Sequence, residues 1–192
     1  MFLVKITSPR LLSKEELMVN RAITFDAPRI IKDFALLDQK GAPFTLDNLK
    51  GKWSLIYFGF THCPDICPTT LAKLAQLEKV LEPEVGEQTQ MILVSLDPAR
   101  DTVDVLSDYM AYFSPEFVGV TGEFMTIMSL TRNVNVAFNK VVLGKDEGYT
   151  IDHTGHLVLV NPNGHYHGIF KPPFELATLK LTLQSIVLQY EQ

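Results

Sequence analysis

The chain of 192 residues carries 17 Lys and Arg against 22 Asp and Glu, a formal net charge of −5 at pH 7. With no basic block and no basic excess, nucleic acid is not expected as a partner. Hydrophobic residues make up 46% of the chain and charged residues 20%, an ordinary balance for a globular protein. No stretch approaches the ~18 uninterrupted apolar residues of a membrane-spanning helix. The apolar start, Met1–Val4, is too short for a signal peptide.

The first part of the chain, residues 1–29, predicts an N-terminal arm ahead of a single domain over residues 30–192. Ser13 followed by Glu16 forms a capping box, which predicts a short helix over 15–21. We expect the rest of this arm to be solvated.

Strand and helix patterns then follow in a regular order. A hairpin is predicted from strands over 34–37 and 43–46. Strands over 53–60, 91–96 and 117–120 alternate with helices over 69–81, 102–113 and 123–134. The chain closes with a hairpin over 157–160 and 165–170 and a helix over 174–190. This order predicts an α/β fold, a thioredoxin-like sandwich with an N-terminal β-hairpin extension.

Cys63 and Cys67 are the only cysteines, and they lie between the first core strand and its helix. One helical turn between them would place their Cα atoms about 6 Å apart. That spacing suits a disulfide, and it also suits one soft metal ion held by two thiolates. A structural bond closing so short a loop contributes only about 2 kcal/mol. A functional pair is therefore favoured over a structural disulfide or two inert thiols.

The residues around the cysteines predict the state of the thiols. Pro68 disfavours the α region for Cys67, so we expect the regular helix to start near Pro68. A thiolate near a helix N-terminus is expected to have a lowered pKa. Asp65 opposes that effect because it adds a negative charge between the two sulfurs. Two thiolates and a carboxylate in one turn would favour a bound cation.

Three ordered blocks of sequence resemble those of the Sco/SenC family of copper chaperones. They are Gly59–Pro68, Val94–Thr102, and Tyr149 together with Asp152–Thr154. The resemblance runs from about Phe34 to Leu188. It implies a thioredoxin-like fold and a copper ion, Cu(I) or Cu(II), bound by Cys63, Cys67 and His153. It also implies that Cys63 and Cys67 form a redox pair, because some members are thought to act as thiol–disulfide reductants.

The resemblance further implies a biological setting. Sco-like proteins serve assembly of the binuclear copper centre of cytochrome c oxidase. The expected partners are thus the copper-bearing oxidase subunit and other copper chaperones. Members are usually tethered by an N-terminal membrane helix, which we do not expect in this sequence. We expect a monomer on the periplasmic side of the bacterial inner membrane, with the mitochondrial intermembrane space as the alternative.

Four further histidines are candidate metal ligands: His62, His156, His165 and His167. A structural zinc ion would want a fourth protein ligand, whereas Cu(I) is satisfied by thiolate and imidazole. His62 adjoins Cys63, and neighbouring residues seldom point to one centre. His165 and His167 are expected to share one face of a strand, where a solvated face is favoured over a second metal site. The role of His156 stays open.

Two acidic residues near these blocks have expected roles. Asp101 is predicted to be the N-cap of the helix over 102–113. Asp152 adjoins His153 and is considered as a hydrogen-bond partner that orients the imidazole.

Two other functions were weighed against copper delivery. A thiol–disulfide oxidoreductase without a metal-delivery role needs only the cysteines, although the C-x-x-x-C spacing differs from the C-x-x-C of a general thioredoxin. A peroxidase would need one activated thiolate, and it is the least favoured of the three.

Overall fold

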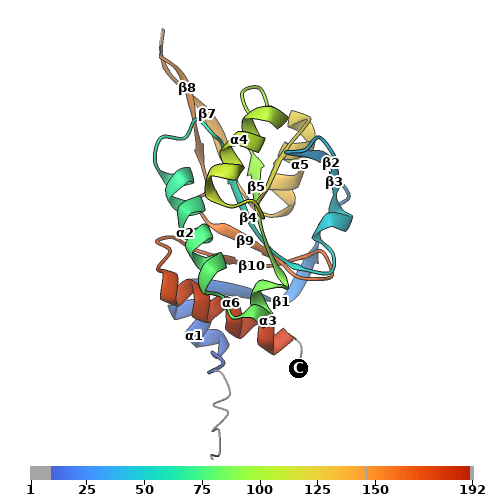
Figure 1. Cartoon of the computed structure of the whole chain (residues 1–192), viewed down its shortest axis with the longest axis vertical. Coiled ribbons are helices and arrows are strands. Elements are labelled where there is room, and N and C mark those ends of the chain that lie inside the picture. Colours follow the sequence, from blue (N-terminus) through green and yellow to red (C-terminus); the bar gives the residue numbers. More distant parts are fainter. Residues whose placement is uncertain (1–9, 146, 191–192) are drawn as a thin grey trace, which may run out of the picture.

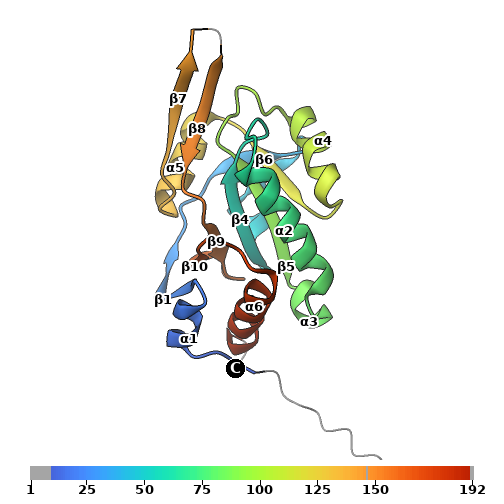
Figure 2. The ribbon, with the colours of Figure 1, turned by 90° about the vertical axis from the view of Figure 1, so that its left-hand side faces the viewer.

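The computed structural model describes residues 10–145 and 147–190. The described part contains one eight-stranded sheet with helices on both faces, and a two-stranded hairpin projects from one end (Figure 1). Figure 2 shows helices α2 and α4 on one side of the sheet and α5 on the other. The predicted α/β sandwich of thioredoxin type is confirmed.

Seventeen helices and strands of the described residues follow one another along the chain. They are α1 (Lys14–Val19), β1 (Ala22–Ile30), β2 (Ala35–Asp38), β3 (Pro43–Thr45), the 3-10 helix η1 (Leu46–Leu49), β4 (Trp53–Gly59), α2 (Ile66–Val80), α3 (Pro83–Gly86), β5 (Thr89–Ser95), α4 (Val103–Phe113), β6 (Val118–Thr121), α5 (Phe124–Asn133), β7 (Phe138–Gly144), β8 (Gly148–His153), β9 (Leu157–Val160), β10 (His165–Phe170) and α6 (Leu176–Tyr190). Among the described residues, none of these helices has the length and apolar character needed to cross a membrane.

The centre of the main sheet positions the cysteine turn. The strand order is β1-β10-β9-β4-β5-β6-β2-β3. Strand β5 pairs in parallel with β4 and with β6, and all the other pairs in this sheet are antiparallel. Every residue of β4 is buried, as expected for a parallel strand covered on both faces. Residues 60–65 follow its carboxyl end and lead into α2. The cysteines therefore lie at the edge of the sheet where open α/β sheets place their sites.

The N-terminal segment is more ordered than expected. The capping box of Ser13 and Glu16 is present at the start of α1. Strand β1 pairs with β10 in the main sheet, so the prediction of a solvated arm is wrong for residues 10–29. The close pairing depends on Gly168, where an added Cβ would lie 2.2 Å from the carbonyl oxygen of Ile23. Residues 1–9 of the expected arm, the apolar start among them, lie outside the described residues.

The hairpin of β7 and β8 was not predicted from the sequence. Its residues are mostly exposed or half-buried, and β7 lacks the apolar alternation that predicts a strand. Among the residues that the structure describes, the two strands pair only with each other. The hairpin matters for the site because His153 is the last residue of β8.

Candidate metal centre

The two cysteines meet at the first turn of α2. The helix begins at Ile66, two residues before Pro68, so Cys67 lies inside its first turn and Cys63 lies just before it. The backbone N–H of Cys67 donates to Cys63 Sγ at 3.4 Å. Both cysteines are free thiols, and their exposed fractions are 9% for Cys63 and 0% for Cys67.

His153 reaches these sulfurs from a distant part of the chain. Its Nε2 atom lies 3.6 Å from Cys67 Sγ, although 86 positions separate the two residues. The ligand atoms of Cys63, Cys67 and His153 all lie within 4.8 Å of one another. The structure therefore brings together the three residues that the sequence singled out.

The His153 ring is held with its Nε2 atom facing the sulfurs. Its Nδ1 atom lies 3.1 Å from the carbonyl oxygen of Thr154. A carbonyl only accepts, so Nδ1 carries the proton and Nε2 keeps its lone pair. The rings of Tyr57 and Phe60 pack edge-on against the imidazole, with centroid distances of 5.8 and 6.1 Å.

Asp152 does not orient the histidine, which corrects that expectation. Asp152 pairs with Asn139 across the hairpin, and the Asp152 side chain is exposed. Successive side chains of a strand point to opposite faces, so Asp152 and His153 face apart. The orienting contact is the backbone carbonyl of Thr154.

Burial controls the protonation of the site. Burial raises the pKa of the Cys67 thiol, and the neighbouring Cys63 raises it further, so the expected lowered pKa at the helix N-terminus is wrong for the metal-free protein. Burial also lowers the pKa of His153, which keeps the imidazole neutral near pH 7. A soft cation would have to displace protons from the thiols, and binding would release them to solvent.

The donor set fits a soft ion better than a structural zinc ion. Two thiols and one neutral imidazole are donors that Cu(I) prefers. A closed zinc site would need a fourth protein ligand, and among the described residues only Cys63, Cys67 and His153 form a group of this kind.

The other histidines lie outside this group. His62 is half-exposed, with Nδ1 3.8 Å from the carboxylate of Asp101. His156 is half-buried, and no second cluster of metal-ligating side chains includes it among the described residues. On β10, His165 and His167 share one face, as predicted, but that face is half-buried and not solvated. The ring of His167 packs edge-on against Trp53, at a centroid distance of 5.0 Å.

Asp101 has a different role from the one expected. The N-cap of α4 is Thr102, whose side chain accepts from the backbone N–H of Val105. Asp101 is fully buried and accepts from the backbone N–H and the hydroxyl of Thr61 at 3.0 and 2.5 Å. Its carboxylate thereby fixes the start of the cysteine turn. Sequence reasoning missed this contact because an Asp before a helix normally predicts a cap.

The fold and the cluster together define a class of protein: a thioredoxin-like domain with two thiols and one imidazole at the carboxyl end of its central strand. Comparison with known proteins gives the family. The family model described as SCO1/SenC matches residues 24–187. The chain belongs to the SCO1/SenC family.

Similar proteins come from bacteria, mitochondria and plants. The "Putative copper-binding protein" of Stutzerimonas stutzeri is 37% identical over 184 residues, which cover 94% of this chain and 89% of that protein. "Protein SCO2 homolog, mitochondrial" of Mus musculus is 40% identical over 133 residues, 69% of this chain but 52% of the relative, so the chain spans about half of its length. The copper-bound crystal structure of Arabidopsis thaliana ScoI is similar with a TM-score of 0.76 and 33% identity, covering 83% of this chain and 99% of that one.

Proposed function

We propose that the chain binds one copper ion through Cys63, Cys67 and His153 and assists assembly of the binuclear copper centre of cytochrome c oxidase. The observation that carries the proposal is the approach of an imidazole nitrogen to within 3.6 Å of a buried sulfur in a pair of free thiols. Membership of the SCO1/SenC family and the copper bound by the Arabidopsis relative support it.

Each residue has a separate part in holding the ion. Cys63 and Cys67 supply the two soft donors after losing their protons. His153 supplies a neutral imidazole whose Nε2 atom needs no deprotonation. Burial of the sulfurs limits access of water, and the half-buried histidine leaves that side of the site nearer to solvent.

The setting of this role follows from the same family relation. The proposed partners are the copper-bearing subunit of the oxidase, which would receive the ion, and other copper chaperones. The proposed location is the periplasmic side of the bacterial inner membrane. The bacterial relative supports it, while the mitochondrial relative supports the intermembrane space as the alternative.

Thiol–disulfide exchange is the second candidate function, favoured by two free thiols whose sulfurs lie within 4.8 Å. In this reaction a thiolate attacks the disulfide of a client protein and forms a mixed disulfide. The second thiol of the pair then displaces the client sulfur. Cys63 and Cys67 end as a disulfide, the client ends as a dithiol, and two electrons and two protons have moved.

A Cu(I) titration of the reduced protein against a chromophoric chelator tests the copper proposal. We expect one equivalent to bind, and we expect the high-affinity binding to be lost in Cys63→Ala and Cys67→Ala. His153→Ala should weaken binding at least tenfold, because the site loses one of three donors. His156→Ala is the matched control, since this half-buried histidine lies three positions away and outside the cluster. Unchanged affinity in His153→Ala would exclude the histidine from the site.

The two candidate functions differ in the need for His153. Reduction of a disulfide in a peptide carrying the paired cysteines of an oxidase copper site should require both thiols but not the imidazole. If His153→Ala kept full reductase activity and wild type bound no copper, the reductase function would stand alone.

A further inference from the structure

A continuous set of hydrogen bonds joins the cysteine turn to the strand that carries His153. It runs through the segment between β5 and α4, the second of the three sequence blocks. We call it the polar bracket, and its members are Thr61, Ser95, Asp97, Arg100, Asp101 and Tyr149.

One end of the polar bracket holds the cysteine turn. Asp101 accepts from Thr61, which lies two residues before Cys63, and from the Ser95 hydroxyl at 2.6 Å. The Ser95 hydroxyl in turn accepts from the backbone N–H of Asp97 at 3.0 Å. Ser95 and Asp101 are fully buried, so these bonds are not in competition with water.

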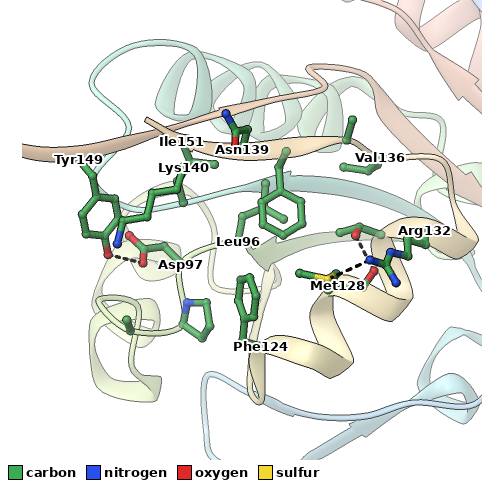
Figure 3. A pocket seen from close by; sticks show the side chains of 15 residues that line it. Leu96, Asp97, Phe124, Met128, Arg132, Val136, Asn139, Lys140, Tyr149 and Ile151 are labelled. Atoms are coloured by element: carbon green, nitrogen blue, oxygen red, sulfur yellow. Dashed lines mark hydrogen bonds between the residues drawn. The ribbon is translucent and has the colours of Figure 1, made fainter. Parts of the chain in front are cut away.

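The other end holds β8 through Tyr149. The Tyr149 hydroxyl donates to Asp97 Oδ1 at 2.8 Å, a contact drawn in Figure 3. Arg100 forms an ion pair with Asp97, donates to the backbone carbonyl of Tyr149 at 3.2 Å, and stacks 3.8 Å from the Tyr149 ring centroid. The ammonium of Lys140, from β7, lies 3.6 Å from the same centroid. Tyr149 is therefore held by contacts to its hydroxyl group, its ring and its backbone carbonyl.

Apolar contacts of the hairpin include Ile151, which is buried, and Phe138, whose ring packs edge-on against Phe124 at 6.1 Å. Its strands form a separate two-stranded sheet, and such a hairpin is marginally stable in isolation. A cavity of about 770 Å³ lies against it, lined by Phe124 and Met128 of α5 and by Ile151 (Figure 3). Apolar packing below the hairpin is thus incomplete. The contacts of Tyr149 therefore contribute more to the position of the hairpin than they would if the core below it were filled.

The alternation of β8 connects this anchor to the histidine. Tyr149, Ile151 and His153 occupy every second position, so their side chains share one face of the strand. A shift of Tyr149 relative to Asp97 would be carried along the strand to His153.

We propose that Tyr149, Asp97 and Arg100 are positioning residues that set the distance between the His153 imidazole and the two sulfurs. None of them belongs to the cluster of Cys63, Cys67 and His153. The inference rests on the proposed copper site. It assigns the same function, positioning His153 relative to the sulfurs, to residues of the second and third sequence blocks. The polar bracket makes the cysteine turn and the histidine strand a single preassembled unit, which lowers the ordering cost of binding.

Tyr149→Phe is the test, because it removes only the hydroxyl that bonds Asp97. We expect Cu(I) affinity to fall about fivefold, the factor that corresponds to one net hydrogen bond. In the His153→Ala background the same substitution should have no further effect, since Tyr149 acts through the imidazole. Tyr112→Phe is the matched control, a tyrosine that is 85% exposed on α4.

A second readout needs no metal and separates this inference from the proposed function. In the metal-free protein, Tyr149→Phe should shift the His153 ring resonances and accelerate amide hydrogen exchange along β8, while Tyr112→Phe changes neither. If copper binding itself fails in wild type, these NMR measurements still decide whether the polar bracket positions the histidine.

Arg100→Lys serves as a second variant if Tyr149→Phe folds poorly, as judged by circular dichroism. It keeps the positive charge but loses the planar stack on Tyr149, and we expect the same direction of change in affinity and exchange. The proposal is overturned if the folded variants keep wild-type affinity and wild-type His153 resonances. It is equally overturned if the loss of affinity persists in the His153→Ala background.

Discussion

Gly59 determines how closely strand β4 approaches the sulfur of Cys67. A Cβ atom added at Gly59 would lie 2.9 Å from Cys67 Sγ and 3.1 Å from the Tyr57 ring. Both neighbours belong to the candidate site, and both are fully or almost fully buried. Any other side chain at this position would therefore displace the sulfur or the tyrosine.

We expect Gly59→Ala to lower the free energy of unfolding by about 1–3 kcal/mol, the usual cost of overpacking a core. Cu(I) affinity should fall as well, because the displaced sulfur is a proposed ligand. Urea denaturation and the chelator titration measure the two effects. Gly155→Ala is the control, since its added Cβ would lie 3.9 Å from the nearest heavy atom, Pro172 Cγ. Wild-type stability and affinity in Gly59→Ala would contradict this explanation of the glycine.

At the residue scale, the sequence predicts the cluster but not its support. Cys63, Cys67 and His153 stand in recognisable blocks, and the structure brings all three together. The contact of the Thr154 carbonyl with the imidazole cannot be predicted from the sequence, because every residue has a backbone carbonyl. The predicted N-cap role of Asp101 is wrong for a related reason. A polar residue before a helix predicts a cap, and only the tertiary structure shows that Asp101 accepts from Thr61. Burial reversed the expected pKa shift of Cys67 in the same way.

At the element scale, the ring of His167 connects strand β10 to strand β4 and helix α6. His167 of β10 packs edge-on against Trp53 of β4 and Tyr190 of α6, at 5.0 and 5.7 Å. The side-chain amide of Asn161 lies 3.2 Å from His167 Nδ1. Burial lowers the pKa of His167 to about 4, so the folded protein keeps this ring neutral well below pH 6.5.

The lowered pKa gives stability a pH dependence of known sign. Below the ordinary histidine pKa of about 6.5, the unfolded chain binds a proton at His167 that the folded chain does not bind. Stability from this group is thus present above pH 6.5 and is lost as the pH falls toward 4. Because the ring is only partly buried, solvent screening reduces the expected loss to about 1–2 kcal/mol.

Urea denaturation at pH 7 and at pH 4.5, in wild type and in His167→Gln, measures this loss. Wild type should lose more stability between the two pH values than the variant, which has no group to protonate at that position. Parallel losses in the two proteins would mean that His167 does not titrate with folding.

The elements themselves were predictable where apolar periodicity is strong. Apart from the four-residue helix α3 (Pro83–Gly86), which was missed, the core strands and helices from β4 to α5 were placed to within a few residues, because their apolar faces meet the core on both sides of the sheet. Strand β1 and the hairpin of β7 and β8 were missed. Their pairing depends on features far along the chain, such as the missing Cβ of Gly168 and the anchoring of Tyr149.

At the scale of the whole molecule, the site is assembled from two parts that lie far apart in the sequence. The turn after β4 and the end of β8 meet at one edge of the sheet, and the segment after β5 is bonded to both. The fold therefore brings the three donor side chains of the cluster together. A metal that binds only the folded chain adds to its stability by mass action, so loading with Cu(I) should also raise the unfolding temperature.

X-ray absorption at the copper K-edge of the Cu(I)-loaded protein reports the atoms bonded to the ion, and it is therefore the sharpest test of the proposed ligand set. We expect two sulfur neighbours and one imidazole nitrogen per copper, with the imidazole signal absent in His153→Ala. A wild-type spectrum without an imidazole contribution, or one that His153→Ala leaves unchanged, would contradict it.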